Sequence, residues 1–404
     1  MESAIVEIKG GVTLSAGFRA GAIYCGIKRS NLDKPDLAII VSDRPAVAAA
    51  AFTTNRIKAA PVKVSQAHLR APETRAFLVN SGNANACTGV QGIENAKHMT
   101  RLTAKALGLR ERQVLVCSTG RIGVQLPMEK MEPRIAELPA LLKSDGSNFV
   151  AKAIMTSDTF EKEFSVRVTA GSRVFHLGGI AKGAGMIDPN MATMLAFLTT
   201  DLPFEKKELQ RCLGIAVEKS FNRITVDGDM STNDTVLLMA NGAAGGPVVR
   251  AGDPVLGPFQ EALNQVTRNL ARMIVEDGEG VTKFVEVQVI GAATYQDARK
   301  AAEAIANSTL VKCAWNGGDP NWGRIVDAVG YSTSKVREEL IDVYYDGLIA
   351  VQNGMASNTP VEELKKAVAN DRFTVTVNLH LGTAQYMVYT TDLSPEYVDL
   401  NRSE

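Results

Sequence analysis

Two hydrophobic periodicities alternate along this chain of 404 residues, and together they restrict the folds it can adopt. Apolar residues recur at helical spacing over 93–107, with Gly108 directly after them, which predicts an amphipathic helix that ends at that glycine. A second stripe of this kind predicts a helix over 259–274. Strict alternation of apolar and polar residues predicts strands over 285–289 and 373–381.

Local signals add two further helices and a turn. A helix is predicted within 204–221, and the spacing of Thr359 and Glu362 predicts a capped helix start with Pro360 at the first helical position. Gly382 and Thr383 predict a hairpin that joins the strand over 373–381 to one over 386–389. The glycine-rich stretch 241–247 is the best linker candidate by composition. Because helices alternate with strands that have one apolar face, we expect an α/β fold whose sheets are covered on one side by helices.

Charge and composition exclude several classes of function. The chain has 44 Lys+Arg and 44 Asp+Glu, so it has no excess of positive charge with which to neutralise the phosphates of a nucleic acid. Its apolar stretches are too short to span a membrane, and its first residues lack the basic start and apolar core of a secretory signal. The five cysteines form no CxxC pair and the four histidines have no zinc spacing. We therefore expect reduced cysteines, no metal site and a cytoplasmic location.

One glycine-rich segment has the composition of a reactive site. Between Lys182 and Leu198 a glycine loop and a proline turn lead into an apolar strand, with Thr193 near its start and the small residue Ala192 before it. An N-terminal nucleophile needs such a segment, because the hydroxyl attacks its own preceding carbonyl and water then releases a new N-terminus. The freed α-amine, with an unperturbed pKa of roughly 7.7–8.0, serves as the base for the hydroxyl. On residue chemistry alone, an ordinary threonine at the start of a strand remains the more frequent interpretation.

Several long motifs, in a fixed order over nearly the whole chain, carry a family resemblance. They are Gly10–Thr13, Phe52–Asn55, Val79–Ala86, Cys117–Gly120, Gly185–Ile187, Pro189–Leu195, Asp227–Asp229, Ser231–Thr235 and Glu276–Glu279. In these motifs the chain resembles the ArgJ family, the ornithine acetyltransferases, which are often bifunctional with glutamate N-acetyltransferase activity.

This resemblance implies self-cleavage between Ala192 and Thr193, which gives an α chain of residues 1–192 and a β chain of residues 193–404. It implies a layered α/β (α+β) sandwich like that of the DmpA-type aminopeptidases, an α2β2 assembly and no cofactor. The implied reaction is ping-pong acyl transfer of arginine biosynthesis. Thr193 takes the acetyl group from N-acetylornithine and passes it to glutamate, and acetyl-CoA is left open as a second donor.

The resemblance also implies roles for individual residues. Thr119 and Gly120 form the oxyanion hole, Lys182 and Thr156 bind a substrate carboxylate, and Glu279 holds a substrate ammonium. Asn401 matches a C-terminal substrate contact, and Ser403 stands in for the terminal hydroxyl. Each of these residues, taken alone, also fits an ordinary turn, loop or tail. Asn233 and Asp234 receive no role beyond structural hydrogen bonding.

Two other functions remain open at this stage. One is a self-cleaving aminopeptidase or amidase of related fold, which would share the nucleophile but pass the acyl group to water. The other is a non-catalytic paralogue that keeps the fold as a binding protein. Lys182 and Glu279 favour an amino-acid acceptor, since they match the charged ends of a zwitterion.

Overall fold

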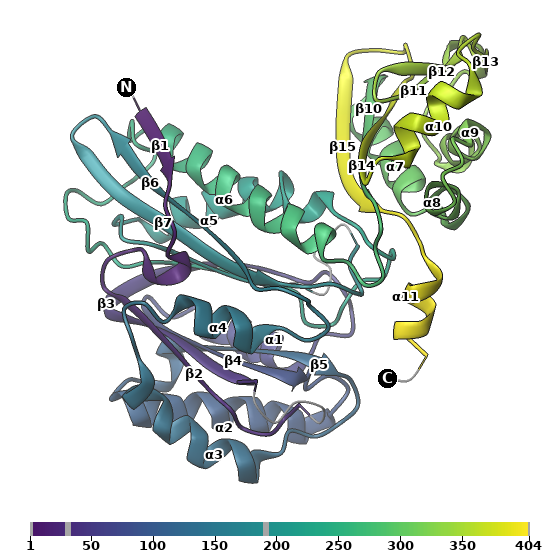
Figure 1. The fold of residues 1–404 in the computed structure, drawn as a ribbon. Helices are drawn as coiled ribbons and strands as arrows, with labels where there is room; N and C mark the ends of the chain where they lie inside the picture. The colour runs from purple at the N-terminus through teal and green to yellow at the C-terminus, as the bar shows by residue number, and fades with distance from the viewer. Residues whose placement is uncertain (1–2, 29–33, 189–193, 403–404) are drawn as a thin grey trace. The chain divides into compact units, whose positions relative to one another are not determined.

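The structure is a computed structural model that describes residues 3–28, 34–188 and 194–402. These residues divide into two compact units (Figure 1). Unit 1 contains residues 1–183, 190–222 and 230–274, and unit 2 contains residues 184–189, 223–229 and 275–404, apart from the positions that the structure does not describe. The unit boundaries therefore differ from the expected cleavage point after residue 192, and strands from both sides of that point belong to unit 1.

The described residues of unit 1 form a nine-stranded sheet with the order β1-β6-β7-β8-β9-β3-β4-β5, in which β2 also pairs with β3. The strands are β1 Ser3–Glu7, β2 Phe18–Ile23, β3 Leu37–Phe52, β4 Thr74–Asn83, β5 Val114–Arg121, β6 Lys162–Ala170, β7 Arg173–Lys182, β8 Leu195–Thr200 and β9 Thr235–Ala240. The long strand β3 connects the two halves of this sheet, because its first half pairs with β2 and β4 and its second half pairs with β9.

Helices cover both faces of this sheet. They are α1 Ala60–His68, α2 Gly89–Leu107, α3 Met128–Glu137, α4 Ser147–Ile154, α5 Lys206–Glu218 and α6 Leu256–Glu276. Alternate residues of β3 separate two cores: Ala38 and Ile40 pack toward α4, whereas Leu37 and Ile39 pack toward α1, α2 and α3. Helix α6 packs against β7, where Val266 and Leu270 lie beside Gly179, and α5 packs against β3, where Gln210 bonds to the backbone of Ala50 (Figure 1). The expectation that helices cover only one side of a sheet is therefore wrong for this unit, where β8 and β9 are buried throughout.

Three of the predicted helices are confirmed. Helix α2 ends at Leu107, and Gly108 adopts the left-handed conformation (φ 67°) that favours glycine at this position. Helix α6 contains the whole apolar stripe predicted over 259–274, and α5 lies within the predicted range 204–221. The periodicity of α2 and α6 showed which face of each helix would be buried, whereas the signals for α5 were weaker.

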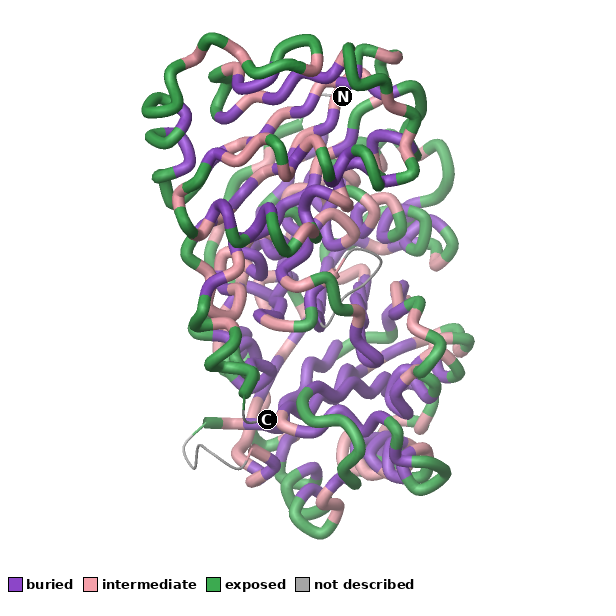
Figure 2. The backbone as a smooth tube through the Cα atoms, turned by 90° about the vertical axis from the view of Figure 1, so that its right-hand side faces the viewer, coloured by how far each residue is buried: buried purple, intermediate pink, exposed green. Residues whose placement is uncertain are grey.

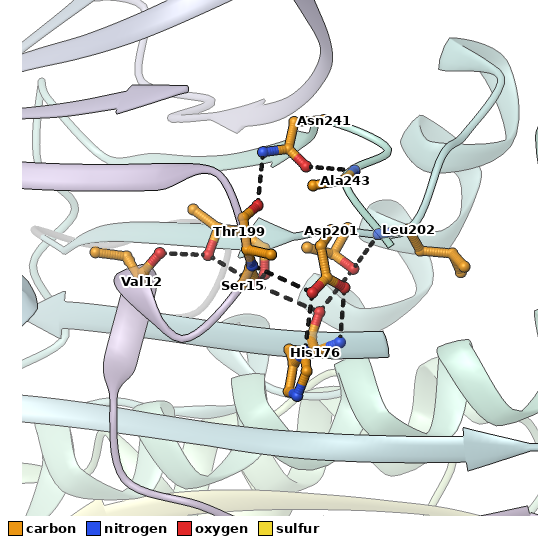
Figure 3. A network of polar contacts seen from close by, with 10 residues as sticks. Val12, Ser15, His176, Thr199, Asp201, Leu202, Asn241 and Ala243 are labelled. Atoms are coloured by element: carbon orange, nitrogen blue, oxygen red, sulfur yellow. Dashed lines mark hydrogen bonds and ion pairs between the residues drawn. The ribbon is translucent and has the colours of Figure 1, made fainter. Parts of the chain in front are cut away.

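The stretch 241–247 is not a linker, because it lies inside unit 1 and is fixed to it by hydrogen bonds (Figure 3). Asn241 donates to the carbonyl of Ala16 at 2.9 Å and accepts from the amide of Ala243 at 3.0 Å. In the same network the carboxylate of Asp201 accepts from the ring and the amide of His176, each at 2.8 Å. Glycines serve here to make a tight turn, which composition alone does not distinguish from a flexible linker.

Unit 2 is built on a six-stranded sheet of the described residues, in the order β13-β12-β11-β14-β10-β15. Its strands are β10 Phe284–Ala292, β11 Asp342–Tyr345, β12 Leu348–Gln352, β13 Met355–Ala356, β14 Arg372–Asn378 and β15 Ala384–Thr391, and its helices are α7 Tyr295–Ala306, α8 Thr309–Asn316, α9 Trp322–Tyr331, α10 Val361–Ala369 and α11 Pro395–Leu400. Buried and less buried residues alternate along β10 and β14, as predicted. Figure 2 shows the backbone coloured by burial, with long buried stretches and exposed segments at its periphery.

Two local predictions for this unit are wrong. Strands β14 and β15 do not form a hairpin, because β10 lies between them, parallel to β14 and antiparallel to β15. The connecting segment crosses the end of β10, where Leu381 and Gly382 donate their amides to the carbonyl of Gly291. The helix predicted to start near Thr359 is confirmed as α10, but the predicted cap is wrong: the helix begins at Val361, Pro360 before it is extended (ψ 134°), and no side chain caps its N-terminus. Alternation and turn residues identify strands and turns, but they do not say which strand pairs with which.

In the described part of the chain, no helix combines the length and the apolar character needed to cross a membrane.

Candidate active site

The turn at Thr119 and Gly120 forms where two parallel strands, β4 and β5, end side by side. Gly120 has φ +128°, and a Cβ atom on it would lie only 2.3 Å from the carbonyl carbon of Gly82 and 2.5 Å from the nitrogen of Asn83. Both the backbone conformation and the close approach therefore require glycine at this position. Thr119 itself is buried.

β5 is the last strand in the order of its sheet, so one edge of it bonds to groups other than a strand. The carbonyls of Val114, Val116 and Ser118 all face this edge, where they accept from His68 (2.9 Å), Ser65 (2.6 Å) and Asn233 (2.8 Å), respectively.

Asn233 is a buried clamp on this turn. Its amide nitrogen donates to the carbonyls of both Ser118 (2.8 Å) and Ala84 (2.7 Å), and its side-chain oxygen accepts from the hydroxyl of Thr232. All polar groups of this side chain are thus engaged in holding the turn. This agrees with the structural hydrogen bonding expected of Asn233.

Lys182, Thr156 and Thr119 come from three separate segments of the chain and meet at one point of unit 1. The ammonium of Lys182 donates to the hydroxyl of Thr156 at 2.7 Å and to that of Thr119 at 3.5 Å. The side chain of Lys182 is only 2% exposed, so its charge is held in the interior rather than in solvent. A buried cation surrounded by hydroxyl groups is well suited to bind a carboxylate.

A buried carboxylate that the sequence reasoning missed organises this cluster. Asp158 accepts from Lys162 (2.7 Å), from the amide of Gly183 (2.7 Å) and from the amide of Thr156 (2.9 Å), and it lies 3.8 Å from the ammonium of Lys182. Burial alone would raise the pKa of Asp158, but the charges of Lys182 and Lys162 and these hydrogen bonds outweigh burial, so its pKa lies well below the usual range. The spacing of Thr156 and Asp158, typical of a local side-chain turn, was the only signal in the sequence.

Asp234 bonds to the residue that directly follows the predicted nucleophile in the sequence. Its buried carboxylate accepts from the amide of Met194 at 3.0 Å, and the carbonyl of Met194 accepts from the amide of Thr235 at 3.1 Å. Both backbone groups of Met194 are therefore fixed at the start of β8.

In unit 2, Glu279 and Asn401 are hydrogen-bonded to each other. The Nδ2 of Asn401 donates to the carboxylate of Glu279 at 2.9 Å and to the carbonyl of Tyr397 at 2.9 Å. A Cβ atom on Gly185 would lie 2.5 Å from the Glu279 carboxylate, so the glycine leaves room for that group. The structure thus joins the residue expected to hold an ammonium with the expected C-terminal contact.

A second carboxylate, Asp227, shapes the loop that follows Gly185. It accepts from the amides of Met186 (2.6 Å) and Ile187 (2.8 Å) and from the hydroxyl of Tyr397 (3.2 Å). Asp188, which follows Ile187 in the sequence, accepts a hydrogen bond from the side-chain amide of Asn307 at 3.0 Å. Burial raises the pKa of Asp188 to about 7, and the nearby charges of Glu303, Asp227 and Asp229 act in the same direction, while the bond from Asn307 opposes them.

The candidate residues therefore fall into two groups within the described chain. Unit 1 brings together Thr119, Gly120, Thr156 and Lys182, and unit 2 brings together Glu279 and Asn401. Ala192, Thr193 and Ser403 lie outside the described residues. Within residues 3–28, 34–188 and 194–402, no group of three or more His, Cys, Asp or Glu side chains is arranged to hold a metal ion.

Sequence comparisons with known proteins agree over almost the full length of the chain. The model of the ArgJ family matches residues 19–403. The arginine biosynthesis bifunctional protein ArgJ of Geobacter sulfurreducens is 50% identical over 386 residues, which cover 95% of this chain and 98% of that protein. The glutamate N-acetyltransferase of Methanocaldococcus jannaschii is 46% identical over 406 residues and 98% of each protein. Among solved structures, an ornithine acetyltransferase from Mycobacterium tuberculosis complexed with ornithine matches at 37% identity, with a TM-score of 0.42, over 46% of this chain and 98% of that chain.

Proposed function

The chain belongs to the ArgJ family, and from that premise we propose that it transfers the acetyl group of N-acetylornithine to glutamate in arginine biosynthesis. The carrier is Thr193, which becomes the N-terminus of a new chain when the bond between Ala192 and Thr193 is cleaved. The names of the relatives from Geobacter and Methanocaldococcus support this choice of pathway and of acceptor.

In the first half of the reaction the α-amine of Thr193 takes the proton of its own hydroxyl, and Oγ1 attacks the acetyl carbonyl of N-acetylornithine. The tetrahedral intermediate collapses when the C–N bond breaks. The ornithine amine leaves with the proton, and an acetyl ester remains on Thr193. In the second half the α-amine of glutamate attacks this ester, and the Thr193 oxygen leaves and regains a proton. An acetyl group from acetyl-CoA would enter the cycle at the same ester.

The observation that carries this proposal is the meeting of Lys182, Thr156 and Thr119 in unit 1. These residues lie 63 and 26 positions apart in the sequence, yet a cation suited to a substrate carboxylate contacts the hydroxyl of the expected oxyanion turn. A substrate carboxylate bound by Lys182 and Thr156 would hold the acylated α-nitrogen close to Thr119. Proximity of this kind makes a large contribution to acyl transfer.

Two further features support the assignment. Asn233 holds the carbonyl of Ser118 at the start of the turn, and the side chain of Thr119 is buried, so the turn is suited to present fixed donors to a developing oxyanion. In unit 2 the carboxylate of Glu279 suits the side-chain ammonium of ornithine, and Asn401 fixes that carboxylate. The segment Gly183–Gly185 connects the two groups along the chain.

We also propose that the two cleaved chains remain together, as in an α2β2 assembly. Strands β8 and β9 of the second chain would lie between β7 and β3 of the first. Six residue pairs join β7 to β8 and six join β3 to β9, so cleavage after residue 192 would leave one continuous sheet. A cytoplasmic location completes the proposal.

The test supplies purified protein with N-acetylornithine and glutamate and measures N-acetylglutamate, ornithine and free acetate. Equal amounts of N-acetylglutamate and ornithine, with little acetate, would support acetyl transfer. Acetate as the main product, with a rate independent of glutamate, would favour the hydrolase instead. Replacing N-acetylornithine with acetyl-CoA in a parallel reaction decides whether that donor is used.

A further inference from the structure

Lys28 borders the oxyanion turn, although neither its position in the sequence nor any motif singles it out. A Cβ atom on Gly82 would lie 3.0 Å from both the Cγ and the amide nitrogen of Lys28, so the lysine packs against the end of β4. Gly82 is also the residue against which Gly120 packs. The ammonium of Lys28 reaches the carbonyl of Ala153 at 3.3 Å, and the same carbonyl accepts from Ser81 of β4 at 2.5 Å.

The charge of Lys28 is poorly compensated by the described residues. Its ammonium donates only to the carbonyls of Pro35 and Ala153, both at 3.3 Å, and no described carboxylate lies within 4.0 Å of it. The nearby carboxylate of Asp36 is engaged by three backbone amides, those of Cys25 (2.6 Å), Ile27 (2.6 Å) and Lys28 itself (3.1 Å). An ammonium has three N–H donors, so Lys28 keeps the capacity to bind an anion.

The electrostatic environment agrees with that geometry. The pKa of Lys28 is lowered to about 8, mainly by burial; the positive charges of Lys182 and Lys34 act in the same direction, while Asp36 and Asp158 oppose the shift. At neutral pH the ammonium of Lys28 is still charged in most molecules, but burial makes its charged form less favourable than it is in water. A bound anion would stabilise the charged form, because it would place a negative charge beside Lys28 and Lys182, which repel each other.

The two amino acids that the proposed reaction handles differ in their side-chain charge. Both carry an α-carboxylate, for which Lys182 and Thr156 suffice. The side chain of ornithine ends in an ammonium, whereas that of glutamate ends in a second carboxylate. A site that discharges acetyl onto glutamate therefore needs a further cation that has no function in the first half of the reaction.

We propose that Lys28 is this cation: it binds the side-chain carboxylate of the acceptor and makes the site selective for a dicarboxylic amino acid. This inference rests on the proposed function, because it requires glutamate to be the acceptor. Lys28 is a specificity-determining residue and takes no part in bond breaking.

The experiment compares the two halves of the reaction in the variant Lys28→Met, which keeps the length of the side chain and removes its charge. Exchange of labelled ornithine into N-acetylornithine reports on the first half alone and needs no glutamate. We expect this exchange to stay within about twofold of the native rate. The KM for glutamate should rise by about 10- to 100-fold, which is the usual loss when a charged hydrogen-bond partner is removed. The preference for glutamate over glutamine should disappear.

Two controls keep the outcome interpretable. Lys130→Met removes an exposed lysine that contacts the same loop through the carbonyl of Gly26 at 3.4 Å, and it should change neither half of the reaction. Lys28→Arg keeps the charge and should retain the preference for glutamate over glutamine that Lys28→Met loses. A purely structural role of the methylene chain would not predict this difference between the two variants.

An unchanged KM for glutamate and an unchanged preference over glutamine in Lys28→Met, with exchange intact, would overturn the role of Lys28 and leave the proposed function standing. A parallel loss of exchange and transfer in both Lys28→Met and Lys28→Arg would also overturn it, since an acceptor-specific residue must spare the first half. Absence of exchange in the native protein would instead refute the proposed function, and the role of Lys28 with it.

Discussion

Substitution of Gly120 by alanine tests the oxyanion turn most sharply. The new Cβ would lie 2.3 Å from the backbone carbon of Gly82, so either Gly120 or the end of β4 must move by about 1 Å to reach an ordinary carbon–carbon contact. Displacement of a positioned group by about 1 Å costs on the order of 100-fold in rate, and loss of one oxyanion donor costs about 100- to 1000-fold. We therefore expect kcat for acetyl transfer to fall by about 100- to 1000-fold in Gly120→Ala.

The assay measures acetyl transfer from N-acetylornithine to glutamate, with each rate divided by the fraction of chains that begin with Thr193. This correction is needed because self-cleavage also passes through an oxyanion and should slow down as well. Gly123→Ala is the matched control: Gly123 has φ +81°, also unfavourable for alanine, but a Cβ atom there meets nothing within 4 Å. It should lose about 1 kcal/mol of stability and little activity. Equal activities of the two variants would refute the assignment of the turn.

Three further predictions concern buried or charged carboxylates. Asp158→Asn leaves Lys162 and Lys182 buried without their carboxylate, so the free energy of unfolding, measured with urea, should fall by about 3–5 kcal/mol at neutral pH. Because the folded-state pKa of Asp158 is depressed, this difference should be present above pH 3.8, its ordinary pKa, and narrow as the solution is acidified below it, and a constant difference would contradict the assignment. Asp188 has a folded-state pKa raised to about 7, so its ionisation should lower the stability of the native protein as the pH rises from about 4 to about 7. Asp188→Asn should therefore gain in melting temperature relative to the native protein at pH 8 but not at pH 4, and an equal difference at both pH values would refute this. Glu279→Gln should raise the KM for N-acetylornithine by about 10- to 100-fold but leave that for N-acetylnorvaline, which lacks the side-chain amine, nearly unchanged, and equal effects on both would exclude an ammonium site.

Local periodicity predicted the individual elements better than their arrangement. The helical spacing of apolar residues in α2 and α6 predicts which face each helix buries. The alternation of apolar and polar residues in β10 and β14 predicts the buried face of the six-stranded sheet. The insertion of β10 between β14 and β15 depends on contacts between residues 88 to 107 positions apart, and turn residues carry no information about them. The prediction of a hairpin failed for that reason.

In the candidate site, too, the sequence predicted some residues and only the structure showed others. The family resemblance implied roles for Thr119, Thr156, Lys182, Glu279 and Asn401, and the structure brings these residues together within their units. Asp158 and Lys28 were missed because a lone aspartate or lysine in a loop has no distinguishing sequence pattern. Their importance arises only from burial and from the charges that the fold places beside them.

The most direct test of the account is to find the acetyl group on Thr193. The cleaved protein is mixed briefly with N-acetylornithine in the absence of glutamate, and the reaction is then quenched in acid. After digestion, the mass of the peptide that begins at residue 193 is measured by mass spectrometry. We predict that this peptide gains the mass of one acetyl group, that glutamate removes it with formation of N-acetylglutamate, and that Thr193→Ala remains one uncut chain without the modification. Acetyl transfer at the native rate by an uncut chain, or with the acetyl group on another residue, would contradict the account.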